Sequence, residues 1–246
     1  MTSFRHRPAR GGPRGTCLFL HGAGGSSLVW LRQLRSLPPG WAAVAPDLPG
    51  PGARPATVEE YTVCLQEFLA CRPLAGPRLV AVGHSLGGAI ALTLALNPSV
   101  ATAGLVLVGT AARFGGDPNF LGRFLAGDHR LAFGPGAPPA LVEASFTRWQ
   151  QGDLETARAA FTAAGRFDAR ARLSAVSQPT LVICGTEDRF TPPPLSQELA
   201  RGIAGARLEL IPGVGHMPML ERPGEFNRLL GSFLERVATL PPGPLC

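Results

Sequence analysis

Short apolar runs alternate along the chain with longer segments that are typical of helices. The runs predict strands near 16–20, 41–46, 78–83, 103–109, 179–184 and 206–211. Helices are expected near 27–37, 57–71, 86–97, 193–203 and 223–238. Because the strands are continuously apolar and alternate with helices, they indicate a mostly parallel sheet covered by helices on both faces. The fold class is therefore α/β.

A long segment, roughly 111–176, separates the strand at 103–109 from the strand at 179–184. Such a long connection between core strands is usually functional. It includes a predicted helix from Asp153 to Ala164, in which Asp153 can cap the N-terminus. Its aromatic residues are Phe114, Phe120, Phe124, Phe133, Phe146, Trp149 and Phe161. Most of them are expected to form a small core of their own, and the rest to line an apolar pocket.

The pentapeptide Gly83-His84-Ser85-Leu86-Gly87 lies between an apolar run and an Ala/Leu-rich segment. A strand, a tight turn with a serine at its apex and then a helix form the geometry of a nucleophile elbow. The turn forces Ser85 into a cramped backbone conformation, and a Cβ at Gly83 or Gly87 would collide with the adjoining helix or strand. A glycine-rich turn with an incidental serine would give the same five letters. The interpretation therefore depends on the other catalytic groups.

A serine hydroxyl needs a base, usually a histidine that a carboxylate orients. In a fold with this elbow the chain order is Ser, acid, His, so the candidate bases are His129 and His216. His216 lies in a Gly/Pro loop after a strand, where catalytic groups gather in open α/β sheets. His129 lies in an irregular polar segment and is expected at the surface, with lining of the site as the alternative. Glu187 and Asp188 both follow the strand at 179–184 and are both candidate acids.

An oxyanion hole needs two backbone N–H groups that point at the developing charge. The amide of Leu86, directly after the nucleophile, is one candidate. The loop after the strand at 16–20 supplies the other, with Ala23 as the expected donor and Gly22, Gly24 and Gly25 allowing close approach of the backbone. The same glycines would suit a phosphate, but the chain has no G-x-x-x-x-G-K-[ST] motif and contains no lysine. A nucleotide site is therefore excluded.

These pieces together resemble the α/β-hydrolase superfamily over nearly the whole chain. The matching segments are His21-Gly22-Ala23-Gly24, Asp47-Leu48-Pro49-Gly50-Pro51-Gly52, Gly83-His84-Ser85-Leu86-Gly87-Gly88, Gly185-Thr186-Glu187-Asp188-Arg189-Phe190-Thr191-Pro192 and Gly215-His216-Met217-Pro218-Met219-Leu220-Glu221-Arg222-Pro223. The resemblance implies Asp188 as the acid, so that Ser85, Asp188 and His216 form the catalytic triad without metal or cofactor. Glu187 is then expected to face solvent or an arginine.

The resemblance also implies how the chain is organised. A single domain is expected over 1–246, with its core at 16–110 and 177–238, a small helical cap over the active site at 111–176, and a flexible tail at 239–246. Members usually carry two antiparallel strands before the oxyanion-loop strand. Because only residues 1–15 precede it here, one or both are expected to be missing. Expected pocket residues are Gly24, Trp149, Phe190 and Met217.

Within the superfamily, a serine nucleophile argues against haloalkane dehalogenases and epoxide hydrolases, which use aspartate. What remains is similar to small carboxylesterases, and a carboxylic ester hydrolase acting on small to medium apolar esters is expected. Lactonases, carrier-protein methyl esterases and perhydrolases stay open because they share the acyl-enzyme chemistry. A carrier-protein esterase would need a basic rim near the cap, which Arg113, Arg123 and Arg148 could supply. A receptor of the same fold without catalysis is the alternative outside enzymes.

Composition narrows the partners. The net charge is +6 and all 23 basic residues are arginine, but they are scattered without a basic-aromatic stripe, so a solvated surface and no nucleic-acid partner are expected. The sequence has no long apolar span and no apolar signal region before residue 16, so no membrane partner and a cytoplasmic location are expected. The cysteines are expected to be mostly buried, reduced thiols. A small-molecule ester is the expected ligand, with monomer and homodimer both open.

Overall fold

A central sheet organises the computed structural model, which describes residues 3–50, 55–72, 74–115 and 118–241. Among these residues the sheet has seven strands in the order β1-β3-β2-β4-β5-β6-β7. They are β1 (Phe4–Arg7), β2 (Gly15–Leu20), β3 (Trp41–Pro46), β4 (Leu79–His84), β5 (Gly104–Val108), β6 (Thr180–Gly185) and β7 (Arg207–Ile211). β1 pairs antiparallel with β3, and every other pairing is parallel. The sheet confirms the predicted α/β class.

The central strands are apolar throughout because both of their faces are covered. Along β4, Leu79 and Ala81 contact one hydrophobic cluster, whereas Val80 and Val82 contact the other. This follows from the two-residue period of a strand, which sends successive side chains to opposite faces. The register brings His84, at the end of β4, level with Val108 at the end of β5. The loops that follow the parallel strands therefore gather at one edge of the sheet.

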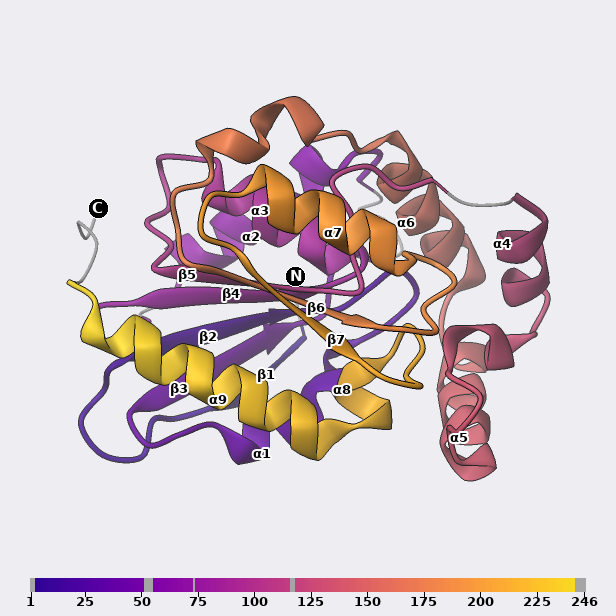
Figure 1. Ribbon diagram of the computed structural model, residues 1–246, viewed down its shortest axis with the longest axis horizontal. Helices are drawn as coiled ribbons and strands as arrows, with labels where there is room; N and C mark the ends of the chain where they lie inside the picture. Colours follow the sequence, from indigo (N-terminus) through magenta and orange to yellow (C-terminus); the bar gives the residue numbers. More distant parts are fainter. Residues whose placement is uncertain (1–2, 51–54, 73, 116–117, 242–246) are drawn as a thin grey trace.

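Two layers of helices cover the sheet (Figure 1). The helices are α1 (Leu31–Ser36), α2 (Val58–Ala70), α3 (Leu86–Ala95), α4 (Pro118–Leu125), α5 (Pro139–Gln150), α6 (Leu154–Arg166), α7 (Pro193–Gly202), α8 (Pro218–Glu221) and α9 (Pro223–Thr239). Short 3₁₀ helices span Ser27–Trp30, His129–Ala132 and Arg170–Ala175. α2, α3 and α7 pack on one face, and α1, α8 and α9 pack on the other. α3 is apolar all round and fully buried, as an Ala/Leu-rich helix beside the sheet centre should be.

The insertion between β5 and β6 contains α4, α5 and α6, and α4 and α5 lie beyond one end of the sheet (Figure 1). The predicted helix from Asp153 is present, and the Asp153 carboxylate accepts a hydrogen bond from the Thr156 amide at 2.9 Å. That helix continues to Arg166 instead of ending at Ala164. Phe124 and Phe133 are buried in a small hydrophobic cluster belonging to this insertion. The insertion thus has its own packed centre.

β1 is a strand that the apolar pattern did not predict. Its residues Phe4, Arg5, His6 and Arg7 alternate between exposed and half-buried positions at the sheet edge. Because the strand is largely polar, it gives no apolar run in the sequence. The described residues therefore contain one antiparallel strand before the oxyanion-loop strand.

Some expectations fall outside the described residues. Pro51 and Gly52 of the loop motif after β3 do so, as do residues 242–246 of the expected flexible tail. Thr239 ends α9 and is part of that helix. The four cysteines in the described ranges are free. Cys17 and Cys184 are buried as expected, whereas Cys64 is half-buried and Cys71 is exposed.

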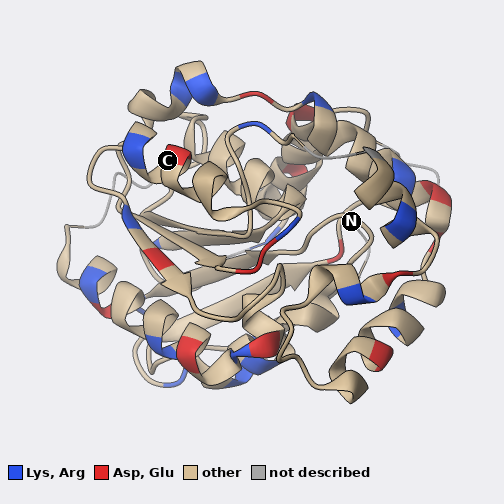
Figure 2. Ribbon diagram, turned by 45° about the vertical axis from the view of Figure 1, so that its right-hand side comes forward, with Lys and Arg blue, Asp and Glu red and all other residues tan. Residues whose placement is uncertain are grey.

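Charged residues are spread over both helix layers, without one sign covering a whole face in the view of Figure 2. This agrees with arginines that solvate the surface. Among the helices of the described residues, none combines the length and the apolar character that a membrane span requires.

Candidate active site

Ser85 lies at the turn between β4 and α3 in a strained backbone conformation. Its φ is +52°, the one positive φ among the described non-glycine residues. The strain is maintained by close packing, because a Cβ at Gly83 would lie 2.1 Å from the Gly87 carbonyl oxygen. A Cβ at Gly87 would lie 2.3 Å from the carbonyl oxygen of Leu20 in β2. Strain of this kind is found at functional sites where the surrounding structure enforces it.

Asp188 lies buried in the loop after β6 and is hydrogen bonded to His216. Its Oδ2 accepts hydrogen bonds from His216 Nδ1 and from the Thr191 hydroxyl, both at 2.9 Å. Its Oδ1 accepts from the Phe190 and Thr191 amides, both at 2.9 Å. These donors fix the carboxylate, and the carboxylate fixes the imidazole with its proton on Nδ1. Nε2 is then free to accept a proton.

Glu187, the other candidate acid, points away from this pair. It is exposed, and its carboxylate accepts a hydrogen bond from the Thr186 hydroxyl at 3.2 Å. Of the two carboxylates that the sequence left open, the structure places Asp188 against His216. The partner of Glu187 is a hydroxyl and not an arginine.

The backbone around His216 is held from several sides. The His216 amide donates to the carbonyl of Ala132 in the insertion at 2.9 Å. The His216 carbonyl accepts from His84 Nε2 at 2.9 Å, and burial lowers the pKa of His84 well below its usual value. His84 therefore serves as a neutral hydrogen-bond donor to the backbone of the candidate base.

Glu221 in α8 adds a support that sequence reasoning missed. Its carboxylate accepts from the amides of Gly134 at 2.8 Å, Gly215 at 3.0 Å and Met217 at 3.3 Å. The two glycines allow the insertion to approach the His216 loop, because a Cβ at Gly215 would lie 2.5 Å from the Gly134 nitrogen. In the sequence, the signal for this support was a glutamate five residues after a candidate base in a Gly/Pro loop.

The residues of the candidate oxyanion loop lie next to the elbow. A Cβ at Gly22 would lie 3.1 Å from Ser85 Cβ, so the loop reaches the serine closely. The amides of Ala23 and Leu86 donate no hydrogen bond to another described residue. His21 anchors the loop: its Nδ1 faces the Gly22 carbonyl at 2.8 Å and its Nε2 accepts from the Leu48 amide at 2.9 Å. Burial lowers the pKa of His21, which keeps that acceptor neutral.

A cavity of about 310 Å³ lies beside Ser85 and His216. All four predicted pocket residues line it, namely Gly24, Trp149, Phe190 and Met217. Phe124 and Phe161 of the insertion line it as well. Phe190 packs against the candidate base, with ring centroids 4.8 Å apart. The lining is mainly apolar, as expected for a site that binds hydrocarbon groups. No hydrogen bond joins Ser85 and His216 in the described structure, and such bonds often tighten only when substrate is bound.

The expectation that His129 is a surface residue was wrong. His129 is only 4% exposed, lines the same cavity, and packs against the rings of Phe124, Phe146 and Trp149. Burial lowers its pKa to about 4, so the ring is neutral at pH 7. The polar neighbours in the sequence, Asp128 among them, concealed the aromatic rings that the fold brings to it.

The three arginines proposed as a basic rim have different surroundings in the structure, and of the three only Arg148 lines the cavity beside Ser85. Arg123 forms an ion pair with Asp128, and the backbone of Arg113 forms an isolated antiparallel β-bridge with that of Asp168.

Within the described ranges, no group of three or more His, Cys, Asp or Glu residues is arranged to hold a metal ion.

Comparisons with known proteins agree with this geometry. The model of the alpha/beta hydrolase family matches residues 17–229. The chain is 33% identical to a Variovorax paradoxus (strain S110) protein named for a carbamate hydrolase activity, RutD, over 95% of each chain. It is 27% identical to a pimeloyl-[acyl-carrier protein] methyl ester esterase of Neisseria meningitidis serogroup B (strain H44/76), over 88% of this chain and 91% of that one.

Among solved structures, a thermophilic esterase from Thermogutta terrifontis superposes with a TM-score of 0.77 at 25% identity, over 96% of this chain and 94% of that one. The strained serine elbow, the strand order and the family match agree with one another. The chain belongs to the α/β-hydrolase family.

Proposed function

We propose that this protein is a serine hydrolase that cleaves small to medium apolar carboxylic esters through an acyl-enzyme. The observation that carries the proposal is the buried Asp188–His216 pair, which opens onto the same cavity as Ser85. A carboxylate that orients an imidazole beside a serine on a strained elbow is the arrangement that activates a hydroxyl. The apolar lining and the volume of about 310 Å³ support a hydrocarbon substrate of modest size.

In the proposed mechanism, His216 Nε2 accepts the proton of Ser85 as the serine Oγ attacks the ester carbonyl. Asp188 holds the ring in the reactive tautomer and stabilises the imidazolium that forms. The amides of Ala23 and Leu86 donate to the oxyanion, for which they have no competing acceptor among the described residues. His216 then returns its proton to the alcohol, which departs and leaves the acyl group on Ser85.

Deacylation repeats these steps with water. His216 removes a proton from the water molecule, the resulting hydroxide attacks the acyl carbonyl, and Ser85 leaves with the proton from His216. A cyclic ester reacts in the same way, except that its alcohol stays attached to the acyl group. Lactone hydrolysis is therefore the second candidate.

The test is hydrolysis of p-nitrophenyl esters from acetate to laurate by the purified protein. We expect steady-state turnover in the wild type and a loss on the order of 10⁶ in kcat for Ser85→Ala or His216→Ala, with little further loss in the double variant. The near-equal losses are expected because the groups act as a unit. Turnover that survives Ser85→Ala would refute the nucleophile. A protein without turnover on esters or lactones would instead be a binding protein of the same fold.

A further inference from the structure

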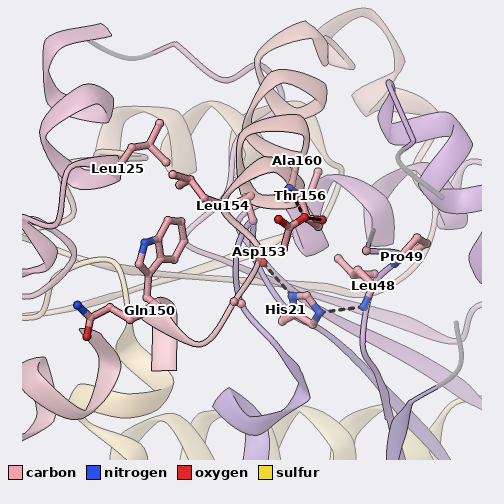
Figure 3. Close-up of a pocket in the computed structure, with 18 of the residues that line it drawn as sticks. His21, Leu48, Pro49, Leu125, Gln150, Asp153, Leu154, Thr156 and Ala160 are labelled. Atoms are coloured by element: carbon pink, nitrogen blue, oxygen red, sulfur yellow. Dashed lines mark hydrogen bonds between the residues drawn. The ribbon is translucent and has the colours of Figure 1, made fainter. Parts of the chain in front are cut away.

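A second cavity lies beside the first and has a volume of about 540 Å³. It opens between the core and the insertion. Figure 3 shows Leu48 and Pro49 of the loop after β3 on one side, and Leu125 and Leu154 of the insertion on the other. Leu86, the residue after the elbow serine, also lines it. The two cavities therefore lie on either side of the elbow, with Ser85 lining the first cavity and Leu86 lining the second.

Among the described residues, six line both cavities: Gly22, Ala23, Gly24, Gly25, Trp149 and Gly152. Five of these are glycine or alanine and contribute mostly backbone to the boundary. Trp149 is the one large side chain in it. The indole of Trp149 is thus the one large group of this wall that a substitution can remove without changing a residue of the loop after β2.

The indole is held in place from two directions. Aromatic rings of Phe124 and His129 lie against it, with centroids 5.0 and 5.1 Å away. On the other side it lies directly over Gly24, where φ is +67° and an added Cβ would be 2.0 Å from Trp149 Cζ3. The absence of a side chain at Gly24 is what lets the ring close the gap to the loop.

Resting on the proposed function, we propose that Trp149 is a specificity-determining partition between the two cavities. It closes the apolar cavity beside Ser85 and so limits the length of the acyl chain that the site accepts. An acyl chain that outgrows the first cavity can continue into the second only when the indole is removed. Trp149 contacts the end of the substrate's acyl chain and takes no part in proton transfer.

The kinetic test compares p-nitrophenyl butyrate with p-nitrophenyl laurate. The laurate-to-butyrate ratio of kcat/KM is expected to rise at least tenfold in Trp149→Ala, because each additional buried methylene contributes about fourfold. Trp149→Phe retains a ring and should keep the ratio within about twofold of wild type. Val142→Ala is the matched control, because Val142 is an apolar residue of α5 that packs in the same cluster but lines neither cavity.

A ratio in Trp149→Ala that stays within twofold of wild type, with unchanged far-ultraviolet circular dichroism, would overturn the proposal. So would an equal rise in Val142→Ala, because the effect would then come from loosening of the insertion. Trp149→Leu keeps apolar volume in the cluster and decides the matter if Trp149→Ala does not fold. The ratio in this variant should lie between those of wild type and Trp149→Ala.

A binding measurement separates this proposal from the proposed function. Calorimetry with dodecanoate is carried out on Ser85→Ala and on Ser85→Ala/Trp149→Ala, neither of which needs to turn over. We expect dodecanoate to bind at least tenfold more tightly to the double variant, and equal affinities would overturn the partition. If the wild type does not hydrolyse esters, the proposed function fails, whereas the binding result still decides on Trp149.

Discussion

Replacement of Glu221 by alanine should damage both stability and the candidate active site. The carboxylate of Glu221 accepts from three backbone amides that belong to two separate segments, Gly134 in the insertion and Gly215 and Met217 around the base. In Glu221→Ala all three amides lose a charged acceptor. The amides of Gly134 and Gly215 are buried, and Glu221 itself is half-buried.

A hydrogen bond to a charged group contributes roughly 1.5–3 kcal/mol. The bonds to Gly134 and Gly215 are short, whereas the bond to half-buried Met217 is long and should contribute less. We therefore expect Glu221→Ala to lower the free energy of unfolding by roughly 3–5 kcal/mol. In the part that remains folded, a displaced His216 should lower kcat by about 10²-fold, because small misplacements of catalytic groups are costly. Glu221→Gln keeps one acceptor oxygen and should lose about half of that stability.

The assay has two parts. Unfolding in urea is followed by circular dichroism, and kcat on p-nitrophenyl butyrate is measured without urea at a temperature at which each protein is fully folded. Glu225→Ala is the control, since Glu225 is an exposed carboxylate in the first turn of α9 and should cost about 1 kcal/mol or less through the helix dipole. The reasoning is refuted if Glu221→Ala unfolds within 1 kcal/mol of wild type and keeps its kcat. An equal loss in Glu225→Ala would show that the charge matters and the three hydrogen bonds do not.

Three further predictions test the remaining parts of the site. Asp188→Asn should lower kcat about 10⁴-fold by favouring the wrong imidazole tautomer, while exposed Glu187→Gln should stay within about twofold; the reverse order would reassign the acid. Ser85→Gly should unfold with a free energy about 1 kcal/mol higher than Ser85→Ala, because glycine relieves the strain at φ +52°, and urea titration of the two variants checks this. Between pH 6.5 and about 4 the unfolded chain binds a proton at His129 that the folded protein does not, so stability should fall as the pH falls. His129→Phe should reduce that slope by up to about 1.4 kcal/mol per pH unit, and urea titrations at pH 7 and 5 that give the same slope for both proteins would contradict it.

Much of the site was predictable because its residues lie in short sequence patterns that can be recognised without knowledge of the fold. Gly83 and Gly87 are needed by a turn only a few residues long, and His216 and Asp188 each follow a strand that is apolar enough to recognise. Parallel strands then bring their carboxyl ends to one edge, so topology supplies the long-range part of the prediction. The α/β class and the apolar strands β2 to β6 follow from the same physical cause, which is burial of both sheet faces, whereas the edge strand β7 is largely exposed or half-buried.

The features that the sequence did not predict depend on the environment that the fold creates, and not on a local pattern. β1 is an edge strand whose arginines and histidine can remain partly exposed, so neither period nor polarity distinguishes Phe4–Arg7 from a loop. His129 is buried by rings of Phe124, Phe146 and Trp149, which are close to it only after α4 and α5 have packed. When a polar residue is buried by side chains from other elements, the hydrophobic pattern of its own segment does not show it.

The insertion supports the candidate base His216 and shapes the cavity through different kinds of contact. Directional hydrogen bonds tie it to the His216 loop, from the His216 amide to Ala132 and from Gly134 to Glu221. The wall at Trp149 is held instead by ring packing, which tolerates a change of volume better than a hydrogen bond tolerates loss of its acceptor. A substitution at Trp149 should therefore change which substrates fit while the base keeps its place, whereas a substitution at Glu221 should displace the base for every substrate alike. This division of contacts therefore requires two different kinetic results. Substitution of Trp149 should change the chain-length preference at constant kcat, whereas substitution of Glu221 should lower kcat at constant chain-length preference.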